Sequence, residues 1–302
     1  IEHPAAKMIV EIAKTQEDEV GDGTTTAVII AGELLKNAED LLEKNVHPTV
    51  IAKGYRLAAK KAIEILDSIA LDVDKDDKEV LRKIAITAMT GKGAESQKEH
   101  LADLVVDAVM QIGDSDEITS DSIKVEKKVG KGVGDSELIL GILLDKEKVH
   151  SGMPHKIENA KIALIDAALE IKSPETDTKV QISSHKEMQA FIDQEERMLK
   201  QMVDQIVKSG ANVVVCQKGI DDLVQHFLAK NNIYAVRRVS KSDIDRVAKA
   251  TGARIVSKVT EIRSDDLGNA GIVEETKIGD EEMTYIKDCK EARAVTLLIR
   301  GG

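Results

Sequence analysis

The first third of the chain has the apolar spacing of helices. From Pro4 to about Gly113, apolar residues recur at steps of three and four, which is the period of an amphipathic helix. An acidic stretch at 72–77 interrupts the pattern and marks a first candidate domain boundary. The expected helices are one that follows residues 21–27 and ends near Asn45, one that begins at Pro48, one that reaches about Thr90 and one from about Ser96 to Ile112.

The pattern changes after Gly113, which marks a second candidate boundary. Short β-type runs separated by Gly, Asp and Ser replace the helical spacing, and further along the chain they alternate with helical segments. This alternation predicts an α/β domain with a partly parallel sheet. The expected strands are 123–128, 138–144, 161–169, 212–217, 234–239, 254–259, 284–287 and 294–299, and the expected helices are 184–208, 220–229 and 242–250.

A carboxylate between two glycines and three hydroxyls precede one of these helices, in the run GDGTTTA at 21–27. Glycines let the backbone approach an oxyanion closely, and the free N–H groups and positive end of a helix favour negative charge there. Asp22 could hold a magnesium ion beside the phosphates. The same run is also an ordinary tight turn with a threonine N-cap, and the motif alone leaves the two interpretations equally open.

A second loop, TAMTGKG at 87–93, ends the third predicted helix with glycines, a lysine and threonines. Lys92 could reach a phosphate as a point charge. Taken alone, the loop favours a plain glycine C-cap with a solvated lysine. P-loop, dinucleotide-binding, zinc-protease and serine-hydrolase signatures are absent from the sequence.

The predicted helix around 184–208 carries an unusual number of methionines on an apolar stripe. Three methionines amid Gln, Glu, Asp and Lys make an adaptable surface of the kind that promiscuous binders use. A stripe that faces the core is the simpler interpretation, and the spacing alone favours it. The stripe consists of Met188, Phe191, Ile192, Met198, Leu199, Met202, Val203 and Ile206.

Composition narrows the class of protein. The 43 Lys and Arg against 54 Asp and Glu give a net charge of −11, which disfavours nucleic acid and anionic membranes as partners. No apolar run is long enough to span a bilayer, so a soluble protein is expected. Cys216 and Cys289 are isolated and are expected to be small core residues in a reduced, cytoplasmic setting. His150 and His155 lack further ligands nearby in the sequence, which argues against a zinc site.

Read together, many runs along the whole chain resemble the subunits of group II chaperonins, the archaeal thermosome family. The matching runs are HPAAKM at 3–8, GDGTTTAV at 21–28, TGK at 90–92, DKEKVH at 145–150, NAKIALID at 159–166, SGANVVVCQKGIDD at 209–222, YAVRRV at 234–239, KATGARIV at 249–256 and AVTLLIRGG at 294–302. So many ordered matches make the resemblance specific. Both ends of the sequence look cut from something longer.

The resemblance implies a multidomain fold of α and α/β parts. Residues 1–71 would form a helical equatorial portion that carries ATPase residues, and 72–134 a mixed intermediate domain. Residues 135–287 would form an α/β apical domain that binds clients, with a helical protrusion near 172–208. Residues 288–302 would return to the intermediate domain as a strand.

The resemblance also implies ligands and partners. Asp22 would ligate Mg²⁺, while the phosphates of ATP or ADP would be bound by Gly23, Thr24, Thr25, Thr26, Thr90 and Lys92. Unfolded or partly folded proteins would contact Met188, Phe191, Ile192, Met198, Leu199 and Met202. Identical or paralogous subunits would complete a double ring, and neither nucleic acid nor membrane is an expected partner.

Three functions follow as hypotheses. The first is an ATP-dependent chaperone subunit that encloses unfolded proteins, driven by Mg-ATP binding and hydrolysis. The second is a passive client-binding module, because the family completes its nucleotide pocket with segments that lie outside this sequence, including the aspartate that positions the attacking water. No catalytic residue is therefore expected within these residues, and the chain alone is expected to be inactive. The third is an unrelated phosphotransferase that uses the GDGTTTA run.

Overall fold

The computed structural model describes residues 2–113, 122–171, 185–290 and 292–301. The chain divides into two compact units, Ile1–Asp77 and Lys78–Gly302. The predicted division at Leu71 lies six residues before this point, and the remaining predicted domain boundaries stay predictions. Each unit is described by itself.

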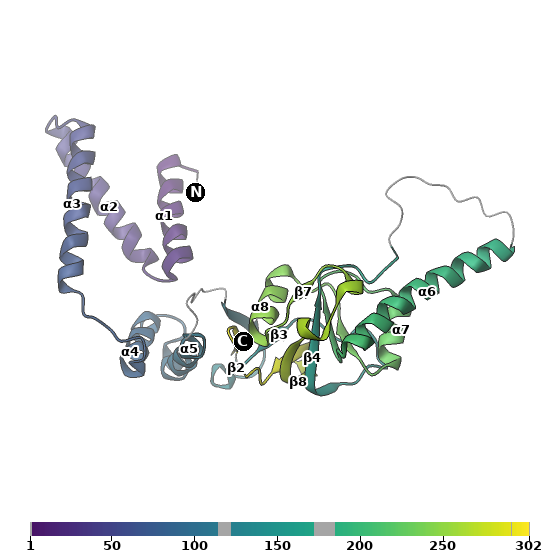
Figure 1. Ribbon diagram of the computed structural model, residues 1–302. Coiled ribbons are helices and arrows are strands. Elements are labelled where there is room, and N and C mark those ends of the chain that lie inside the picture. The colour runs from purple at the N-terminus through teal and green to yellow at the C-terminus, as the bar shows by residue number, and fades with distance from the viewer. Residues whose placement is uncertain (1, 114–121, 172–184, 291, 302) are drawn as a thin grey trace. The chain divides into compact units, whose positions relative to one another are not determined.

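Three helices form the first unit (Figure 1): α1 is Pro4–Val20, α2 is Thr24–Glu43 and α3 is Pro48–Ile69. Proline at the first position favours the starts of α1 and α3, because its missing N–H is not needed there. The Nδ1 atoms of His3 and His47 accept the N–H groups of Ala5 and Thr49, so each histidine caps its helix. α1 packs on α2, and α2 packs on α3.

These helices bury little of their apolar surface within the described residues. Ile51 of α3 is the one buried residue of the three helices. Large apolar side chains such as Met8, Ile29 and Leu66 are exposed. Because most helical stability comes from packing an apolar face, the three-helix unit has apolar stripes available for further contacts.

In the second unit, one helix packs on a three-stranded sheet and a second helix packs on the first. α4 is Lys78–Met89 and α5 is Lys98–Ile112, while β1 is Ile123–Lys128, β2 is Glu137–Ile139 and β10 is Val295–Arg300. β10 lies in the middle, parallel to β1 and antiparallel to β2, and α5 packs on it. Ion pairs join α4 to α5: the guanidinium of Arg82 bonds Asp103 at 2.5 Å and also Glu99.

The larger sheet has seven strands. They are β3 Ile142–Leu144, β4 Lys156–Ile165, β5 Val213–Cys216, β6 Tyr234–Val236, β7 Ile255–Val256, β8 Gly268–Ile278 and β9 Glu281–Lys287. The order is β3-β9-β8-β4-β5-β6, and β7 also pairs with β4. β4, β5 and β6 are parallel, as the alternation of strands and helices predicts, while β8, β9 and β3 are antiparallel.

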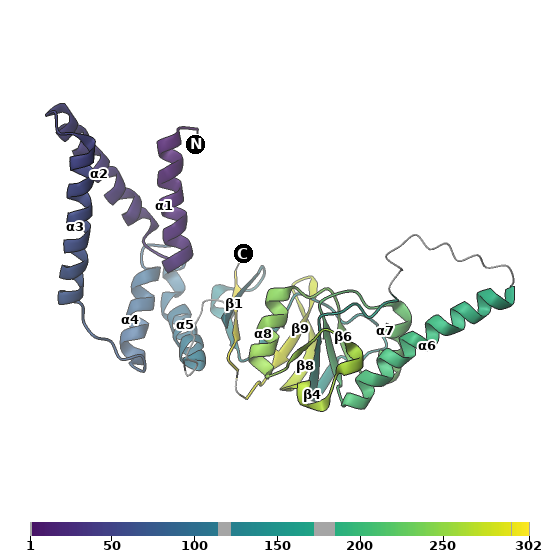
Figure 2. The same ribbon diagram turned by 45° about the horizontal axis from the view of Figure 1, so that its top comes forward.

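Helices cover both faces of this sheet. α6 is His185–Ser209, α7 is Asp222–Lys230 and α8 is Lys241–Thr251. Alternate residues of β4 and β5 point to opposite faces: Leu164 and Val215 pack in the cluster with α8, and Ile165 and Cys216 in the cluster with α6 and α7. Figure 2 shows α8 on one side of the sheet and α6 with α7 on the other.

Three strand predictions differ from the structure. The predicted run 138–144 is two strands, β2 and β3, which belong to different sheets. β8, with 11 residues, was not predicted, because its first four residues include two glycines and it continues through Glu274 and Glu275. The predicted strand 254–259 is reduced to the two residues of β7, followed by a 3-10 turn at Val259–Glu261.

The chain crosses between the two sheets twice, and the crossings lie together. The Thr296 hydroxyl of β10 donates to the carbonyl of Gly141 at 3.1 Å and accepts the N–H of Leu143 at 3.2 Å. The N–H of Cys289 on the returning segment donates to the carbonyl of Leu140. The outgoing and returning segments are therefore hydrogen-bonded to one another.

Lysines of β1 add ion pairs between the sheets. Lys124 bonds the carbonyl of Leu143 at 2.7 Å and lies 3.0 Å from Asp243 of α8. Lys128 pairs with Glu281 of β9. Lys124 and Asp243 are both largely buried, so their pair is screened less than a surface pair, whereas Glu281 is exposed.

Gly141 provides a test of the first crossing. Its φ is 147°, and a Cβ placed there would lie 1.9 Å from the carbonyl oxygen of Ile286. We expect Gly141→Ala to lower the free energy of unfolding by about 2–4 kcal/mol through backbone strain and displacement of β9. Urea unfolding monitored by circular dichroism measures the change. Gly93→Ala is the control, because nothing lies within 4 Å of its Cβ position, and an equal loss in both variants would contradict the steric explanation.

The two cysteines are buried core residues, as predicted from the sequence. Burial raises the pKa of Cys216 to about 11 and that of Cys289 to about 12, so both remain thiols at neutral pH. Because the thiolate is the reactive form, we expect neither to react with an aromatic disulfide reagent in the folded chain. Absorbance of the released thiol should appear only in denaturant. Rapid reaction of either cysteine without denaturant would contradict the described packing.

Candidate functional site

The GDGTTTA run forms a tight connection between α1 and α2. Gly21 ends α1 with φ 71° and donates its N–H to the carbonyl of Glu17. Gly23 precedes α2 with φ 81°. Both values lie in the left-handed region that glycine adopts without strain, so the two glycines set the path of the backbone on either side of Asp22.

The start of α2 offers unpaired backbone donors. The N–H of Ala27 donates to the carbonyl of Gly23 at 2.9 Å, which is the first helical hydrogen bond. The three N–H groups before it, those of Thr24, Thr25 and Thr26, have no hydrogen-bond partner within the described residues. Gly23 has no side chain to cap them. The run is therefore a turn, and it also leaves three donors at the positive end of a 20-residue helix.

A residue that the sequence analysis did not single out holds this loop. The side-chain amide of Gln16 on α1 donates to the carbonyl of Asp22 at 2.9 Å. A Cβ at Gly23 would lie 3.1 Å from the same amide nitrogen. Gln16 thus fixes the loop from one side, and the second glycine leaves room for it. A lone glutamine six residues before the aspartate gives no recognisable sequence signal.

The donor set fits a magnesium ion bound together with phosphates. Asp22 is half-buried, and Thr24, Thr25 and Thr26 follow it within four residues of the chain. Among the described residues no group of three or more His, Cys, Asp or Glu side chains could hold a metal ion. Mg²⁺ suits such a site, because it often takes one or two carboxylates and completes its shell with phosphate oxygens and water.

The loop after α4 has the features of a glycine-ended helix. Thr90 donates its hydroxyl to the carbonyl of Ile86 at 2.8 Å, and Gly91 follows with φ 75°. The carboxylate of Glu95, a further residue that was not singled out from the sequence, accepts the N–H of Gly91 at 3.0 Å. Lys92 is exposed next to it. The structure thus describes a C-cap followed by an exposed lysine.

The predicted nucleotide residues lie in both units. Asp22, Gly23 and the three threonines are held together by the α1–α2 connection of the first unit. Thr90 and Lys92 belong to the second unit. The structure brings together the residues within each group.

The methionine-bearing helix α6 has two different halves. Its first half is largely exposed: 50% of Met188, 47% of Phe191 and 49% of Ile192 are accessible, and Met198 is exposed as well. In Figure 1, α6 runs beside α7 and its N-terminal end extends beyond the sheet. Residues 172–184 of the predicted protrusion lie outside the described residues. The exposed side chains recur at helical spacing and form one apolar stripe.

The second half of α6 corrects one predicted client-binding residue. Leu199 is only 2% exposed and packs with Val203 and Ile206 against the core. It cannot meet a client, because the period of the helix turns it toward α7 and β5. Met202 is half-buried and packs at the edge of the same cluster. The second half of α6 thus faces the core, as the simpler interpretation predicts, while the first half is exposed.

The two histidines that were considered for zinc have other partners. The Nδ1 atom of His155 lies 2.8 Å from the Nζ atom of Lys148 and 3.2 Å from the carboxylate of Glu275. Burial opposes ionisation of Glu275, but the hydrogen bonds from Lys148 and its charge lower the pKa of that carboxyl. His150 accepts the N–H of Gly152.

Within the described ranges, no helix is long and apolar enough to cross a membrane.

Comparisons with known proteins identify relatives of the whole chain. The model of the TCP-1/cpn60 chaperonin family matches residues 1–302. A thermosome subunit of Methanopyrus kandleri is 58% identical over 306 residues, covering 100% of this chain and 56% of the relative. The thermosome subunit beta of Methanothermobacter thermautotrophicus is 60% identical over 301 residues, with the same coverage. The chain thus spans little more than half the length of these relatives.

A solved structure agrees with the sequence relatives. The open-state monomer of a group II chaperonin from Methanococcoides burtonii matches with a TM-score of 0.63 and 44% identity, over 94% of this chain and 65% of that one. The chain therefore belongs to the TCP-1/cpn60 chaperonin family, and its relatives there are thermosome subunits and group II chaperonins.

Proposed function

We propose that the chain is the part of an ATP-dependent chaperone subunit that binds Mg-ATP at the α1–α2 loop and unfolded proteins at α6. The observation that carries the proposal is the α1–α2 loop itself. It combines one carboxylate, three hydroxyls and three unpaired N–H groups at a helix start, which is a donor set for a metal-bound phosphate chain. Membership of the chaperonin family supports the same function.

Each residue of the loop has a proposed task. The N–H groups of Thr24, Thr25 and Thr26 donate to phosphate oxygens, and the positive end of α2 stabilises their charge. Asp22 orients the metal-bound phosphates, and Gln16 keeps that loop in place through its bond to the Asp22 carbonyl. A magnesium ion would be held by Asp22 and would supply positive charge to the phosphates. Thr90 and Lys92 provide further contacts to phosphate.

Client binding is proposed for the exposed half of α6. Unfolded proteins of different sequence share exposed apolar surface, so a receptor for them needs apolar contacts without strict shape. Met188, Phe191, Ile192 and Met198 present such a stripe, and flexible methionines adapt to different partners. Identical or paralogous subunits, arranged as a double ring in the cytoplasm, would surround the client.

The passive client-binding module is the weaker proposal. It assigns no role to the unpaired N–H groups at Thr24 to Thr26 or to the carboxylate beside them. The phosphotransferase hypothesis explains the loop but gives no role to the exposed stripe of α6. The chaperone function uses both features.

Asp22→Asn tests the nucleotide site. The substitution keeps the shape of the side chain and removes its charge, so we expect Mg²⁺-dependent ATP turnover by the full-length protein to fall by at least about 100-fold. Phosphate release measures turnover. Asp40→Asn is the matched control, because Asp40 is exposed near the C-terminal end of α2, away from the loop. Equal turnover in the Asp22 variant and this control would refute the assignment of Asp22.

Phe191→Ser with Ile192→Ser tests the client surface. Both side chains are exposed, so we expect the fold to persist while protection of a chemically unfolded client against aggregation is lost. Light scattering of the client measures protection. The control is Ile84→Ser on α4, where an isoleucine is 54% exposed outside α6. Full protection by the α6 variant would exclude this stripe from client binding.

A further inference from the structure

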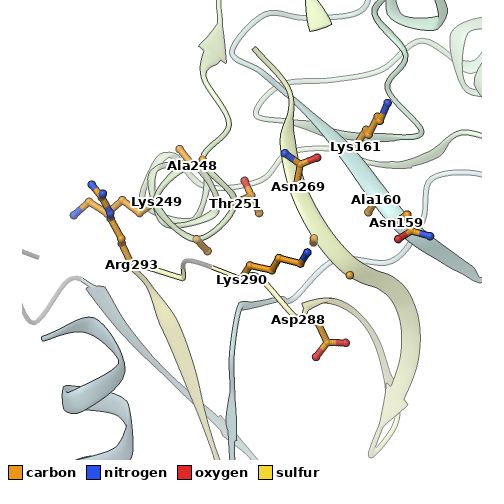
Figure 3. A pocket seen from close by; sticks show the side chains of 14 residues that line it. Asn159, Ala160, Lys161, Ala248, Lys249, Thr251, Asn269, Asp288, Lys290 and Arg293 are labelled. Atoms are coloured by element: carbon orange, nitrogen blue, oxygen red, sulfur yellow. The ribbon is translucent and has the colours of Figure 1, made fainter. Parts of the chain in front are cut away.

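The second unit contains a pocket that the proposed function does not use. It lies between the C-terminal end of α8, the start of β8 and the segment that leads from β9 to β10, and its volume is about 860 Å³ (Figure 3). Ligand pockets for small molecules commonly have volumes of about 300–1,000 Å³. The size therefore suits a small molecule.

Four cationic side chains line this pocket: Lys161, Lys249, Lys290 and Arg293. One carboxylate, that of Asp288, lines it too. None of the four cations forms an ion pair with the described residues. The chain as a whole carries a net charge of −11, whereas the charged side chains that line the pocket are mainly cationic. Unpaired cations around a concave site concentrate anions there.

The cations are spread along the pocket. Figure 3 shows Lys249 and Arg293 at one end and Lys161 at the other, with the side chain of Lys290 extending between them toward Asn269. Two asparagines, Asn159 and Asn269, add amide groups to the lining. A single phosphate would reach only part of this set. An extended anion with several charges would reach more of it.

The inner lining is made of small residues. Ala160, Ala250 and Ala270 are buried and contribute only methyl groups. A Cβ at Gly271 would lie 2.6 Å from the Cβ of Asp288, so β8 approaches the returning segment as closely as a glycine permits. The pocket is thus open space above a packed floor, and no large side chain fills it.

Two residues on the rim have a left-handed backbone conformation. Asn159 has φ 51° and Asp288 has φ 57°, both in the left-handed region that is uncommon for residues other than glycine. Such conformations tend to occur at binding sites, where the surrounding structure maintains them. Both residues line the same pocket, although they belong to different segments of the chain.

Two features of the pocket disfavour anion binding, but the four cationic side chains outweigh them. The carbonyl end of α8 carries about half a negative charge, and Gly252, which follows it, donates its N–H to the carbonyl of Ala248. Asp288 adds one full negative charge. Against these stand the four cations. The pocket keeps a positive excess, and an anion with several negative charges gains from it.

We infer that this pocket binds a small oligophosphate anion, at a site separate from the α1–α2 loop and without a requirement for Mg²⁺. Phosphate oxygens accept hydrogen bonds from lysine and arginine, and a linear chain of phosphates matches the spread of the cations. The bound anion joins α8 to the segment that carries Lys290 and Arg293. It therefore stabilises the returning passage from β9 to β10.

The test uses inorganic triphosphate and the full-length protein in magnesium-free buffer, measured by isothermal titration calorimetry. All variants carry Asp22→Asn, which removes metal-assisted binding at the α1–α2 loop, and any triphosphate that the N–H groups of this loop still bind is common to all variants. We expect the pocket itself to bind one triphosphate per chain in this background. Lys249→Gln with Lys290→Gln should weaken binding by about 100-fold, since each charged hydrogen bond contributes about tenfold. The affinity should also fall as salt rises.

The matched control is Lys230→Gln with Lys241→Gln, two exposed lysines on α7 and α8 outside the pocket, with the same change of charge. Its affinity should stay within about twofold of the background, as expected for charges that are screened and distant. Amide hydrogen exchange in 288–290 and 292–294 should slow when triphosphate binds to the background protein. This second readout does not depend on the stability of the lysine variants.

Three outcomes would overturn the inference. One is equal triphosphate affinity in the pocket variant and the control variant. Another is no calorimetric binding and no change of exchange in the background protein. The third is tighter binding of a hexaglutamate peptide than of triphosphate at the same lysines, because the pocket would then serve an acidic peptide.

Discussion

The buried hydroxyl of Thr296 holds together the two places where the chain passes between the sheets of the second unit. It donates to the carbonyl of Gly141 and accepts the N–H of Leu143, so the outgoing segment is tied to the strand that returns. In the chain, all the elements from β3 to β9 lie between these two crossings. β10 can therefore occupy the middle of the three-stranded sheet, although its partners β1 and β2 lie far earlier in the chain. The ion pairs of Lys124 and Lys128 add to the same attachment.

Much of the fold follows from the sequence, for physical reasons that also explain the failures. The helices and the parallel strands β4, β5 and β6 have strong apolar periods, and their existence was predicted. β8 was missed because its polar residues and opening glycines hide a strand that is held by neighbours on both sides. The division at Gly141 was missed because a switch between sheets depends on tertiary hydrogen bonds, and the apolar run continues across it.

In the candidate sites too, features made of contiguous residues could be predicted, and features that depend on tertiary packing could not. The α1–α2 loop could be proposed from the sequence because its chemistry is contiguous, whereas the bond from Gln16 depends on how α1 packs on α2. Leu199 was assigned to the surface because its stripe continues that of Met188 and Phe191, and only packing separates the two halves. The cationic pocket could not be seen in the sequence, since its lysines and arginine come from three separate segments.

The division of α6 has a mechanical consequence. The helix has 25 residues and so is about 38 Å long, and its core contacts begin only at Leu199. The helix is therefore anchored to the core only at its C-terminal part, and its unanchored N-terminal part carries Phe191 and Ile192. A small rotation of α6 about its anchored C-terminal part gives a larger displacement at its N-terminal end. The hydrogen bonds of the helix keep the spacing of the apolar side chains constant during this motion. The N-terminal part of α6 can therefore adjust to partners of different shape without repacking the core that holds its C-terminal part.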